Sequence, residues 1–289
     1  MKIGIIGVGV VGGATAQVLK KEHELYLYDK YKPEYNAAGN LEKLALESEV
    51  VFICVPTPMK KSGEIDYSAI FNSIESLREK TESNGRIPSD LLVTIRSTAV
   101  SGTTDKLAQK YPFRFAFNPE FLTERNAQKD MENTDRIVIG ANDEKSKKDL
   151  LNVYKPLFPN AKYATVPVKA AEMIKYAANV MLAGQIALAN EIYQICNHVG
   201  VDYTVVKETI LQDSRIGRNL DVPGPDGNLG FGGKCFPKDL NALIYFAREH
   251  GYDSHLLVET WRSNLDVREE RDWYDIPGAT SENPHKEKD

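Results

Sequence analysis

The sequence predicts an α/β protein, with an N-terminal Rossmann-type doubly wound sheet followed by an all-helical domain built on one long central helix. Short apolar runs alternate with amphipathic stretches in the first half, a glycine-rich turn follows the first run, and residues 170–199 form one long helical pattern. We expect a dinucleotide-binding domain over residues 1–165, a helical domain over 166–265 and an irregular C-terminal tail over 266–289.

The first half contains the segments of a parallel sheet covered by helices on both faces. Strands are expected at Ile3–Ile6, Glu24–Tyr28, Val50–Val55, Leu91–Ile95, Arg114–Phe117 and Arg136–Ile139. Helices are expected at Gly12–Lys20, Tyr67–Lys80, Thr103–Lys110 and Glu144–Leu157. Strand and helix in alternation indicate a parallel sheet.

The second half reads as helices around a long loop. The helical patterns are Ala170–Val199, Tyr203–Gln212 and a helix that starts near Pro237 and ends at Gly251. The loop between them, Asp213–Lys234, is too long for a plain connector, so we expect an ordered or functional loop. After about Trp261 the sequence becomes charged and irregular, and Thr280–Asp289 is expected to be a frayed tail.

Composition and charge favour a cytoplasmic globular protein that binds neither nucleic acid nor membrane. The net charge is −5, so there is no global basic field. The longest apolar runs, such as Val50–Val55, are too short to span a bilayer, and Met1 leads directly into a strand, which leaves no room for a signal peptide. The three cysteines show neither a disulfide framework nor zinc-ligand spacing, so no metal is expected.

A dinucleotide site is predicted at the first strand–helix turn, Gly7-Val8-Gly9-Val10-Val11-Gly12. Gly7 allows the tight turn, Gly9 lets a pyrophosphate approach the backbone, and Gly12 lets helix and strand pack closely. Asp29, 22 residues after Gly7, ends the second strand, where a carboxylate can hold ribose hydroxyls and repel a 2′-phosphate. The motif therefore favours NAD over NADP as the cofactor; the alternative is a glycine turn of an unrelated α/β protein, with Asp29 as a solvated strand end.

A second motif, Gly230–Asp239, places Cys235 just before a helix. The helix dipole with Lys234 and Lys238 should favour the thiolate. Asp239 follows one helical turn later, so it could share a site with the thiol. The alternative for any single cysteine is a small buried hydrophobic residue, which suits Cys54 and Cys196 but not Cys235.

With these motifs in their observed order, the chain resembles the family of UDP-glucose and GDP-mannose dehydrogenases from Lys2 to about Asp266. The resemblance implies that the catalytic residues are Cys235, Lys175, Asn179, Asp239, Glu120 and Thr98. It implies that the cofactor contacts Gly7, Gly9, Val10, Val11, Gly12, Asp29, Pro56, Thr57, Thr98 and Glu124. It implies that the substrate contacts Glu120, Phe121, Leu122, Lys175, Asn179, Arg215, Phe231 and Gly232. Arg215, in Arg215-Ile216-Gly217, matches an arginine that reaches substrate across a dimer interface.

Part of this assignment has support from the residues themselves. Lys175 and Asn179 are four apart on a predicted helix, so they project from one face and could stabilise an oxyanion. By spacing alone a solvated polar stripe is the favoured alternative, although the surrounding helix is rich in alanine and expected to be buried. Glu120 and Glu124 could equally be a solvated helix face.

The family's reaction implies two successive oxidations, from alcohol through aldehyde to carboxylate, with two NAD and one water consumed. Cys235 would form a thiohemiacetal and then a thioester, and Asp239 or Glu120 would serve as base. UDP-glucose is the favoured substrate and UDP-glucuronate the product, with a UDP-N-acetylhexosamine left open. We expect a homodimer through the helix 170–199, because that helix is apolar around much of its circumference.

Two features depart from the family pattern. A third, nucleotide-binding domain is missing, and we expect a naturally compact form. The loop Val222–Gly227 is longer than the family pattern and is hypothesised to cover the nucleotide side of the site, with a harmless surface insertion as the alternative.

Two other functions compete with this interpretation. A two-electron β-hydroxyacid-type dehydrogenase would explain the lysine and the missing domain but would not need Cys235. A non-catalytic dinucleotide-binding module would not need the full set of Lys175, Asn179, Cys235 and Asp239.

Overall fold

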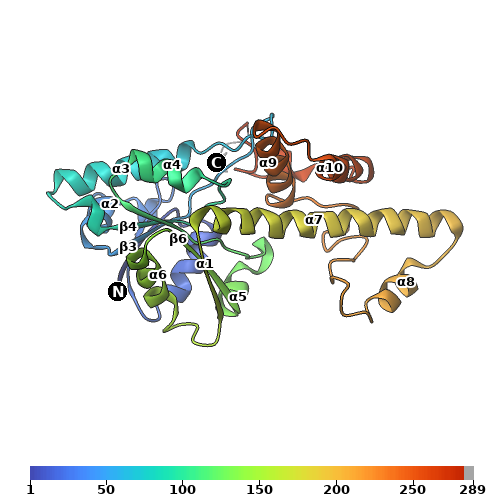
Figure 1. The fold of residues 1–289 in the computed structure, drawn as a ribbon, viewed down its shortest axis with the longest axis horizontal. Helices are drawn as coiled ribbons and strands as arrows, with labels where there is room; N and C mark the ends of the chain where they lie inside the picture. Colours follow the sequence, from blue (N-terminus) through green and yellow to red (C-terminus); the bar gives the residue numbers. More distant parts are fainter. Residues whose placement is uncertain (283–289) are drawn as a thin grey trace. The chain divides into compact units, whose positions relative to one another are not determined.

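The computed structural model describes residues 1–282 and divides into two compact units. Unit 1 comprises Met1–Thr57 and Tyr67–Lys175, and unit 2 comprises Pro58–Asp66 and Tyr176–Asp289. The long helix α7 (Val168–Val199) begins in unit 1 and continues into unit 2 (Figure 1). This helix confirms the long helical pattern of the sequence.

Unit 1 is built on a seven-stranded sheet of order β2-β1-β3-β4-β5-β6-β7. The strands are β1 (Lys2–Ile6), β2 (Glu24–Tyr28), β3 (Val50–Ile53), β4 (Leu92–Ile95), β5 (Arg114–Phe117), β6 (Arg136–Ala141) and β7 (Lys162–Val166). The first five strands pair in parallel, as predicted. Strand β6 is antiparallel to β5, so the prediction of an all-parallel sheet was wrong there, because an apolar run does not encode strand direction.

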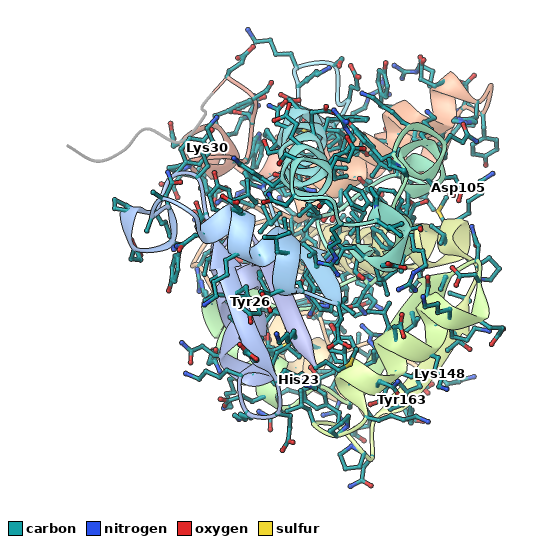
Figure 2. All side chains as sticks on the ribbon, turned by 90° about the vertical axis from the view of Figure 1, so that its left-hand side faces the viewer. His23, Tyr26, Lys30, Asp105, Lys148 and Tyr163 are labelled. Atoms are coloured by element: carbon teal, nitrogen blue, oxygen red, sulfur yellow. The ribbon has the colours of Figure 1, made fainter. Side chains whose placement is uncertain are left out.

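Strand β7 was not predicted, and its place in the sheet explains why. It pairs in parallel with β6 at the sheet edge. Its five residues are all exposed or half-buried, so it lacks the continuous apolar run of a central strand. Figure 2 labels Tyr163 on this edge strand and Tyr26 on the opposite edge strand β2. His23 Nε2, before β2, lies 2.8 Å from the carbonyl oxygen of Val153.

Helices cover both faces of the sheet, which confirms the doubly wound architecture (Figure 1). They are α1 (Val10–Leu19), α2 (Asn40–Glu47), α3 (Ser68–Ser83), α4 (Thr103–Lys110), α5 (Ala127–Glu132) and α6 (Glu144–Tyr154). One apolar core lies under α2, α3 and α4, and a second lies under α1, α5 and α6. Helices α2 and α5 were not predicted.

Unit 2 packs α8 (Tyr203–Ile210), α9 (Phe236–Glu249) and α10 (His255–Val267) with the second part of α7. Its core joins Val180 and Ala183 of α7 to Leu240 of α9 and to Phe231. Helix α10 corrects the expectation of irregular structure after Trp261. Its buried positions are the polar Thr260 and Asn264, while its apolar Leu257 and Trp261 are partly buried against the core of unit 2.

The chain after α10 is also more ordered than expected. Trp273 lies in a 3-10 turn (Asp272–Tyr274) and is 1% exposed. Met59 N donates to the Ala279 carbonyl over 3.0 Å, and Ser281 N donates to the Met59 carbonyl over 2.8 Å. Residues 280–282 of the expected frayed tail are thus paired, and residues 283–289 lie outside the described part.

Within residues 1–282, none of the helices combines the length and apolar character needed to cross a lipid bilayer.

Candidate active site

The glycine turn between β1 and α1 has the conformation that the motif predicts. Gly7 has φ +90°, a left-handed value that favours glycine, and its N–H donates to the Tyr28 carbonyl. A Cβ on Gly12 would lie 1.9 Å from the Gly7 oxygen, so no side chain fits there. A Cβ on Gly9 would meet nothing within 4 Å, which leaves open space at the start of α1. These residues fit a dinucleotide whose pyrophosphate lies at the helix N-terminus.

Asp29 lies beside this turn and is already hydrogen-bonded. Its Oδ2 accepts from Val8 N over 2.7 Å, and its Oδ1 accepts from Tyr31 N over 3.0 Å. Lys32 Nζ donates to the Val8 carbonyl over 2.8 Å, so a cation lies close to the expected ribose site. Sequence reasoning missed Lys32, because nothing in the motif marks a lysine three residues after the acid.

The remaining predicted cofactor residues follow the carboxyl ends of neighbouring strands. Pro56 and Thr57 follow β3, Thr98 follows β4, and Glu124 follows β5. Ser97 Oγ donates to the Val55 carbonyl over 2.6 Å, which ties the ends of β3 and β4 together. Ligands of doubly wound sheets bind at this edge, so unit 1 brings these positions to the side where a cofactor is expected.

Lys175 and Glu120 form a buried ion pair in unit 1. Lys175 Nζ lies 2.7 Å from Glu120 Oε1 and 2.8 Å from the Glu120 carbonyl oxygen. The side chains are 4% and 9% exposed. Glu120 Oε2 also accepts from Leu122 N over 2.7 Å, and Lys175 Nζ lies 5.7 Å from the Phe121 ring centroid. Four of the predicted substrate-binding residues are therefore in one group.

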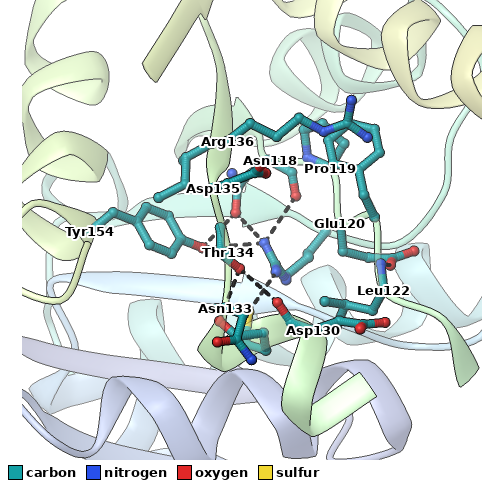
Figure 3. A pocket seen from close by; sticks show the side chains of 14 residues that line it. Asn118, Pro119, Glu120, Leu122, Asp130, Asn133, Thr134, Asp135, Arg136 and Tyr154 are labelled. Carbon is teal, nitrogen blue, oxygen red and sulfur yellow. Dashed lines mark hydrogen bonds between the residues drawn. The ribbon is translucent and has the colours of Figure 1, made fainter. Parts of the chain in front are cut away.

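A polar network holds the start of the Asn118–Thr123 segment in place (Figure 3). Arg96, 5% exposed, donates to Asn118 Oδ1 and to Tyr154 OH. Tyr154 OH donates to Asn118 Oδ1 over 2.6 Å, and Asn118 Nδ2 donates to the Val138 carbonyl over 2.7 Å. Burial raises the pKa of Tyr154 to about 12, so this hydroxyl remains a donor at neutral pH.

A cavity of about 450 Å³ lies against the same network. Its walls include Arg96. Glu120 and Asp130 also line it (Figure 3). Asp130 Oδ2 accepts from both the backbone N and the Oγ1 of Thr123, which anchors the end of the Asn118–Thr123 segment. Sequence reasoning missed Asp130 and Tyr154; the partner of Tyr154, Asn118, is 36 residues away in the sequence.

In unit 2, Asp239 is held between an amide and a cation. Asn179 Nδ2 donates to Asp239 Oδ2 over 2.5 Å, and Lys238 Nζ donates to Asp239 Oδ1. Asp239 is 1% exposed, and its N–H donates to the Cys235 carbonyl over 2.8 Å. The structure thus brings Asn179 and Asp239 together. Lys238 was expected to act on the Cys235 thiol, whereas in the structure its ammonium pairs with the Asp239 carboxylate.

The three cysteines lie in different surroundings, and no disulfide joins any of them within the described chain. Cys235 directly precedes the first residue of α9, as predicted. Cys54 follows β3, where burial raises the pKa of its thiol to about 12. Cys196 is 7% exposed in α7, consistent with a buried hydrophobic residue.

Three predicted substrate residues of unit 2 differ in their surroundings. Arg215 is 87% exposed and pairs with its neighbour Asp213. Phe231 is 3% exposed and belongs to the core of unit 2. A Cβ on Gly232 would lie 2.2 Å from Arg268 Nη2, so a side chain there would displace the Arg268 guanidinium.

The chain matches two domains of one family. Residues 24–158 match the NAD binding domain of the UDP-glucose/GDP-mannose dehydrogenase family, and residues 169–266 match its central domain.

Relatives with known names agree with this match. UDP-glucose 6-dehydrogenase of Rickettsia felis is 35% identical over 223 residues, which are 75% of this chain and 48% of that protein. The chain thus spans about half the length of the curated relatives it matches. The structure of a UDP-glucose dehydrogenase from Pyrobaculum islandicum superposes with a TM-score of 0.80 at 31% identity, over 92% of this chain and 68% of that chain.

A third similarity concerns the fold alone. Mycobacterium tuberculosis 3-hydroxyisobutyrate dehydrogenase has a TM-score of 0.71 at 18% identity, over 93% of this chain and 96% of that chain.

Proposed function

Because this chain belongs to the UDP-glucose/GDP-mannose dehydrogenase family, we propose that it oxidises the C6 alcohol of UDP-glucose to the carboxylate of UDP-glucuronate with NAD. The observation that carries the proposal is the group of Cys235, Asn179 and Asp239. In it a cysteine precedes a helix, and a buried carboxylate one turn later accepts from an amide. A simple two-electron alcohol dehydrogenase does not need this cysteine.

The first oxidation converts the alcohol to the aldehyde. Bound NAD would supply the hydride acceptor, and the chain supplies position and charge. Lys175 and Asn179 stabilise the developing oxyanion, while Asp239, directly or through water, takes the hydroxyl proton. The Lys175–Glu120 pair supports this role, since it holds the ammonium in one place.

The second oxidation is covalent. Cys235 Sγ bonds to the aldehyde carbon, and the aldehyde oxygen takes a proton, which gives a thiohemiacetal. Loss of a second hydride from that carbon, for which a second NAD would be the acceptor, together with loss of the hydroxyl proton, leaves a thioester. Water then cleaves the carbon–sulfur bond, with Asp239 or Glu120 as base, and releases the carboxylate and the thiol. Replacement of Cys235 by serine should keep substrate binding and abolish net turnover.

A homodimer through α7 is part of the proposal. Met181, Leu188, Ile195 and Val199 are each more than half exposed, at 67%, 62%, 55% and 63%. Their spacing of seven, seven and four places them along one stripe of the helix. The exposed Arg215 would then be available to the partner's substrate. A Leu188→Glu variant should elute as a monomer by size-exclusion chromatography with light scattering, and a monomeric parent chain would contradict the dimer.

The deciding experiment uses the purified recombinant chain. It measures the NADH formed from limiting UDP-glucose with excess NAD. Two NADH per UDP-glucose, with UDP-glucuronate found by mass spectrometry, support the proposal. One NADH per substrate indicates the two-electron β-hydroxyacid type of chemistry. No NADH with UDP-glucose, GDP-mannose or UDP-N-acetylhexosamines, together with tight NAD binding, indicates a non-catalytic dinucleotide-binding module.

A further inference from the structure

The glycine loop before Cys235 is held by charged side chains from the segment that follows α10. Arg268, at the end of α10, is 2% exposed. Its Nη2 lies 2.8 Å from Asp226 Oδ2 and 3.2 Å from Asp272 Oδ1. Its Nη1 donates to the Leu229 carbonyl over 3.3 Å, and its Nε donates to the Glu270 carbonyl over 2.8 Å. A buried guanidinium thus joins two carboxylates and two carbonyls.

This group contacts the two glycines that precede Lys234 and Cys235. Asp272 Oδ2 accepts from Gly233 N over 3.0 Å. A Cβ on Gly232 would lie 2.2 Å from Arg268 Nη2 and 2.3 Å from Asp272 Oδ1. The absence of a side chain at position 232 therefore lets the ion pair pack directly against the loop backbone.

A second layer fixes the other end of the loop. Asn264 Oδ1 accepts from Phe231 N over 2.7 Å, and Asn264 Nδ2 donates to the Phe231 carbonyl over 3.0 Å. Trp273, next to Asp272, packs against Trp261, with the two ring centroids 5.3 Å apart. The ring centroids of Trp261 and Phe231 are 6.4 Å apart. Both ends of Gly230–Gly233 are thus attached to α10 and to the turn after it.

We infer that Asp226, Arg268 and Asp272, called the Arg268 clamp below, are positioning residues that set the place of Cys235 by holding Gly232 and Gly233. The inference rests on the proposed function for its catalytic consequence. Arg268 and Asp272 lie beyond the segment matched by the family's central domain. Asp226 lies in the Val222–Gly227 loop, so its contact with Arg268 ties that loop to the end of α10. Neither of the two roles predicted for the loop, covering the nucleotide or being a harmless surface insertion, includes this contact.

The geometry explains why the clamp consists of charged groups. The guanidinium is delocalised and planar, so it can bond several acceptors without leaving a buried charge unpaired. Small displacements of a reacting group are costly, since a shift of about 1 Å can lower a rate about 100-fold. A thiol next to a three-glycine loop needs such a restraint, because glycine itself supplies little stiffness.

The test uses the full chain and reads the position of Cys235 in two ways. The first readout is the rate of Cys235 alkylation by iodoacetamide, resolved by peptide mass spectrometry, which needs no substrate. The second is the division of any loss between kcat and KM for UDP-glucose. The variants are Asp272→Ala, Asp272→Asn, which keeps an acceptor for Gly233, and Arg268→Lys. Glu259→Gln is the matched control, since it breaks an exposed ion pair of α10 with Arg262 that is remote from the clamp.

Asp272→Ala should raise the alkylation rate of Cys235 about threefold or more, because the released loop opens more often. It should lower kcat about 10- to 100-fold while KM changes less than about threefold. Asp272→Asn should recover part of both effects, and Glu259→Gln should match the parent chain. If Asp272→Ala does not fold, Asp272→Asn and Arg268→Lys decide by the same readouts.

Unchanged alkylation and an unchanged kcat in folded clamp variants would overturn the inference. If the parent chain turns over no sugar nucleotide, the proposed function fails while the alkylation rates still decide whether the clamp positions Cys235. A loss shared equally by the clamp variants and Glu259→Gln would indicate general destabilisation of α10 and would also contradict the inference.

Discussion

Lys175 donates to two oxygens of the same residue, the side-chain Oε1 and the backbone carbonyl of Glu120, over 2.7 and 2.8 Å. The ammonium thus satisfies the carboxylate and also restrains the backbone of the segment that carries Phe121 and Leu122. A buried ion pair of this kind is weak evidence for net stability, but its disruption leaves an unpaired charge.

Lys175→Met should therefore affect both activity and folding. The change leaves the Glu120 carboxylate buried without its cation, which costs about 3–5 kcal/mol of unfolding free energy in comparable pairs. We expect turnover of UDP-glucose to fall at least about 100-fold, since an oxyanion donor is lost. Chemical denaturation and steady-state kinetics measure the two effects. Lys147→Met, which breaks the exposed pair with Glu144, is the control and should change neither.

Asp239→Asn should separate chemistry from cofactor binding. The amide cannot accept a proton as a general base, so we expect kcat to fall about 10²- to 10⁴-fold. The predicted NAD contacts are in unit 1, so the dissociation constant for NAD should stay within about twofold by calorimetry. A variant that keeps the parent rate of UDP-glucuronate formation would remove Asp239 from the mechanism.

Cys54, which follows strand β3, and Cys235, which precedes helix α9, should differ in reactivity. Burial raises the pKa of Cys54 to about 12, so at pH 8 only about one thiol in ten thousand is ionised. Iodoacetamide at pH 8 should therefore modify Cys235 in the folded chain and modify Cys54 only after denaturation. Peptide mass spectrometry gives the order of labelling. Rapid labelling of Cys54 at pH 8 would show that its thiol is not shielded.

Asp29→Asn should weaken the preference for NAD. The substitution removes the charge that repels a 2′-phosphate, while the neighbouring Lys32 remains. We expect KM for NAD to rise and the ratio of kcat/KM between NAD and NADP to fall about tenfold, as measured with both cofactors. Lys32→Ala is the control, since it removes the neighbouring cation and keeps the Asp29 carboxylate, and it should leave NAD preferred over NADP. An unchanged ratio in Asp29→Asn would mean that Asp29 only supports the glycine turn through Val8 N.

Glu172 gives a prediction about pH. Burial raises the pKa of its carboxyl above the ordinary value of 4.5, although Thr104 N, Thr104 Oγ1 and Gly102 N all donate to it. A carboxyl with a raised folded pKa contributes stability that is complete below the unfolded pKa and is lost as pH rises through the folded pKa. Glutamine does not titrate, so the unfolding free energy of the parent minus that of Glu172→Gln should decrease from pH 4.5 toward neutrality. Denaturant titrations at several pH values test this, and a difference that grows with pH would contradict the assignment.

Local patterns were sufficient for much of unit 1. The spacing of Gly7, Gly9 and Gly12 predicts the turn, because Gly7 takes a left-handed φ and Gly12 lies against the Gly7 carbonyl within the same β–α unit. The apolar run Val50–Val55 predicts a central strand, observed as β3 (Val50–Ile53), because a strand covered on both faces has no polar position. The edge strand β7 lacks such a pattern and was missed, and so was α10, whose buried positions are polar.

By itself the sequence determined the family, the doubly wound sheet, the long helix and the placement of Cys235 before α9, since all of these follow from residues close together in the chain. Only the tertiary structure decided the antiparallel direction of β6, the pairing of Lys238 with Asp239 and the contacts of Arg268 with Asp226 and Asp272. Strand direction depends on how a connection crosses the fold. The partner of a buried charge depends on which side chains burial leaves within reach, and sequence spacing does not encode either.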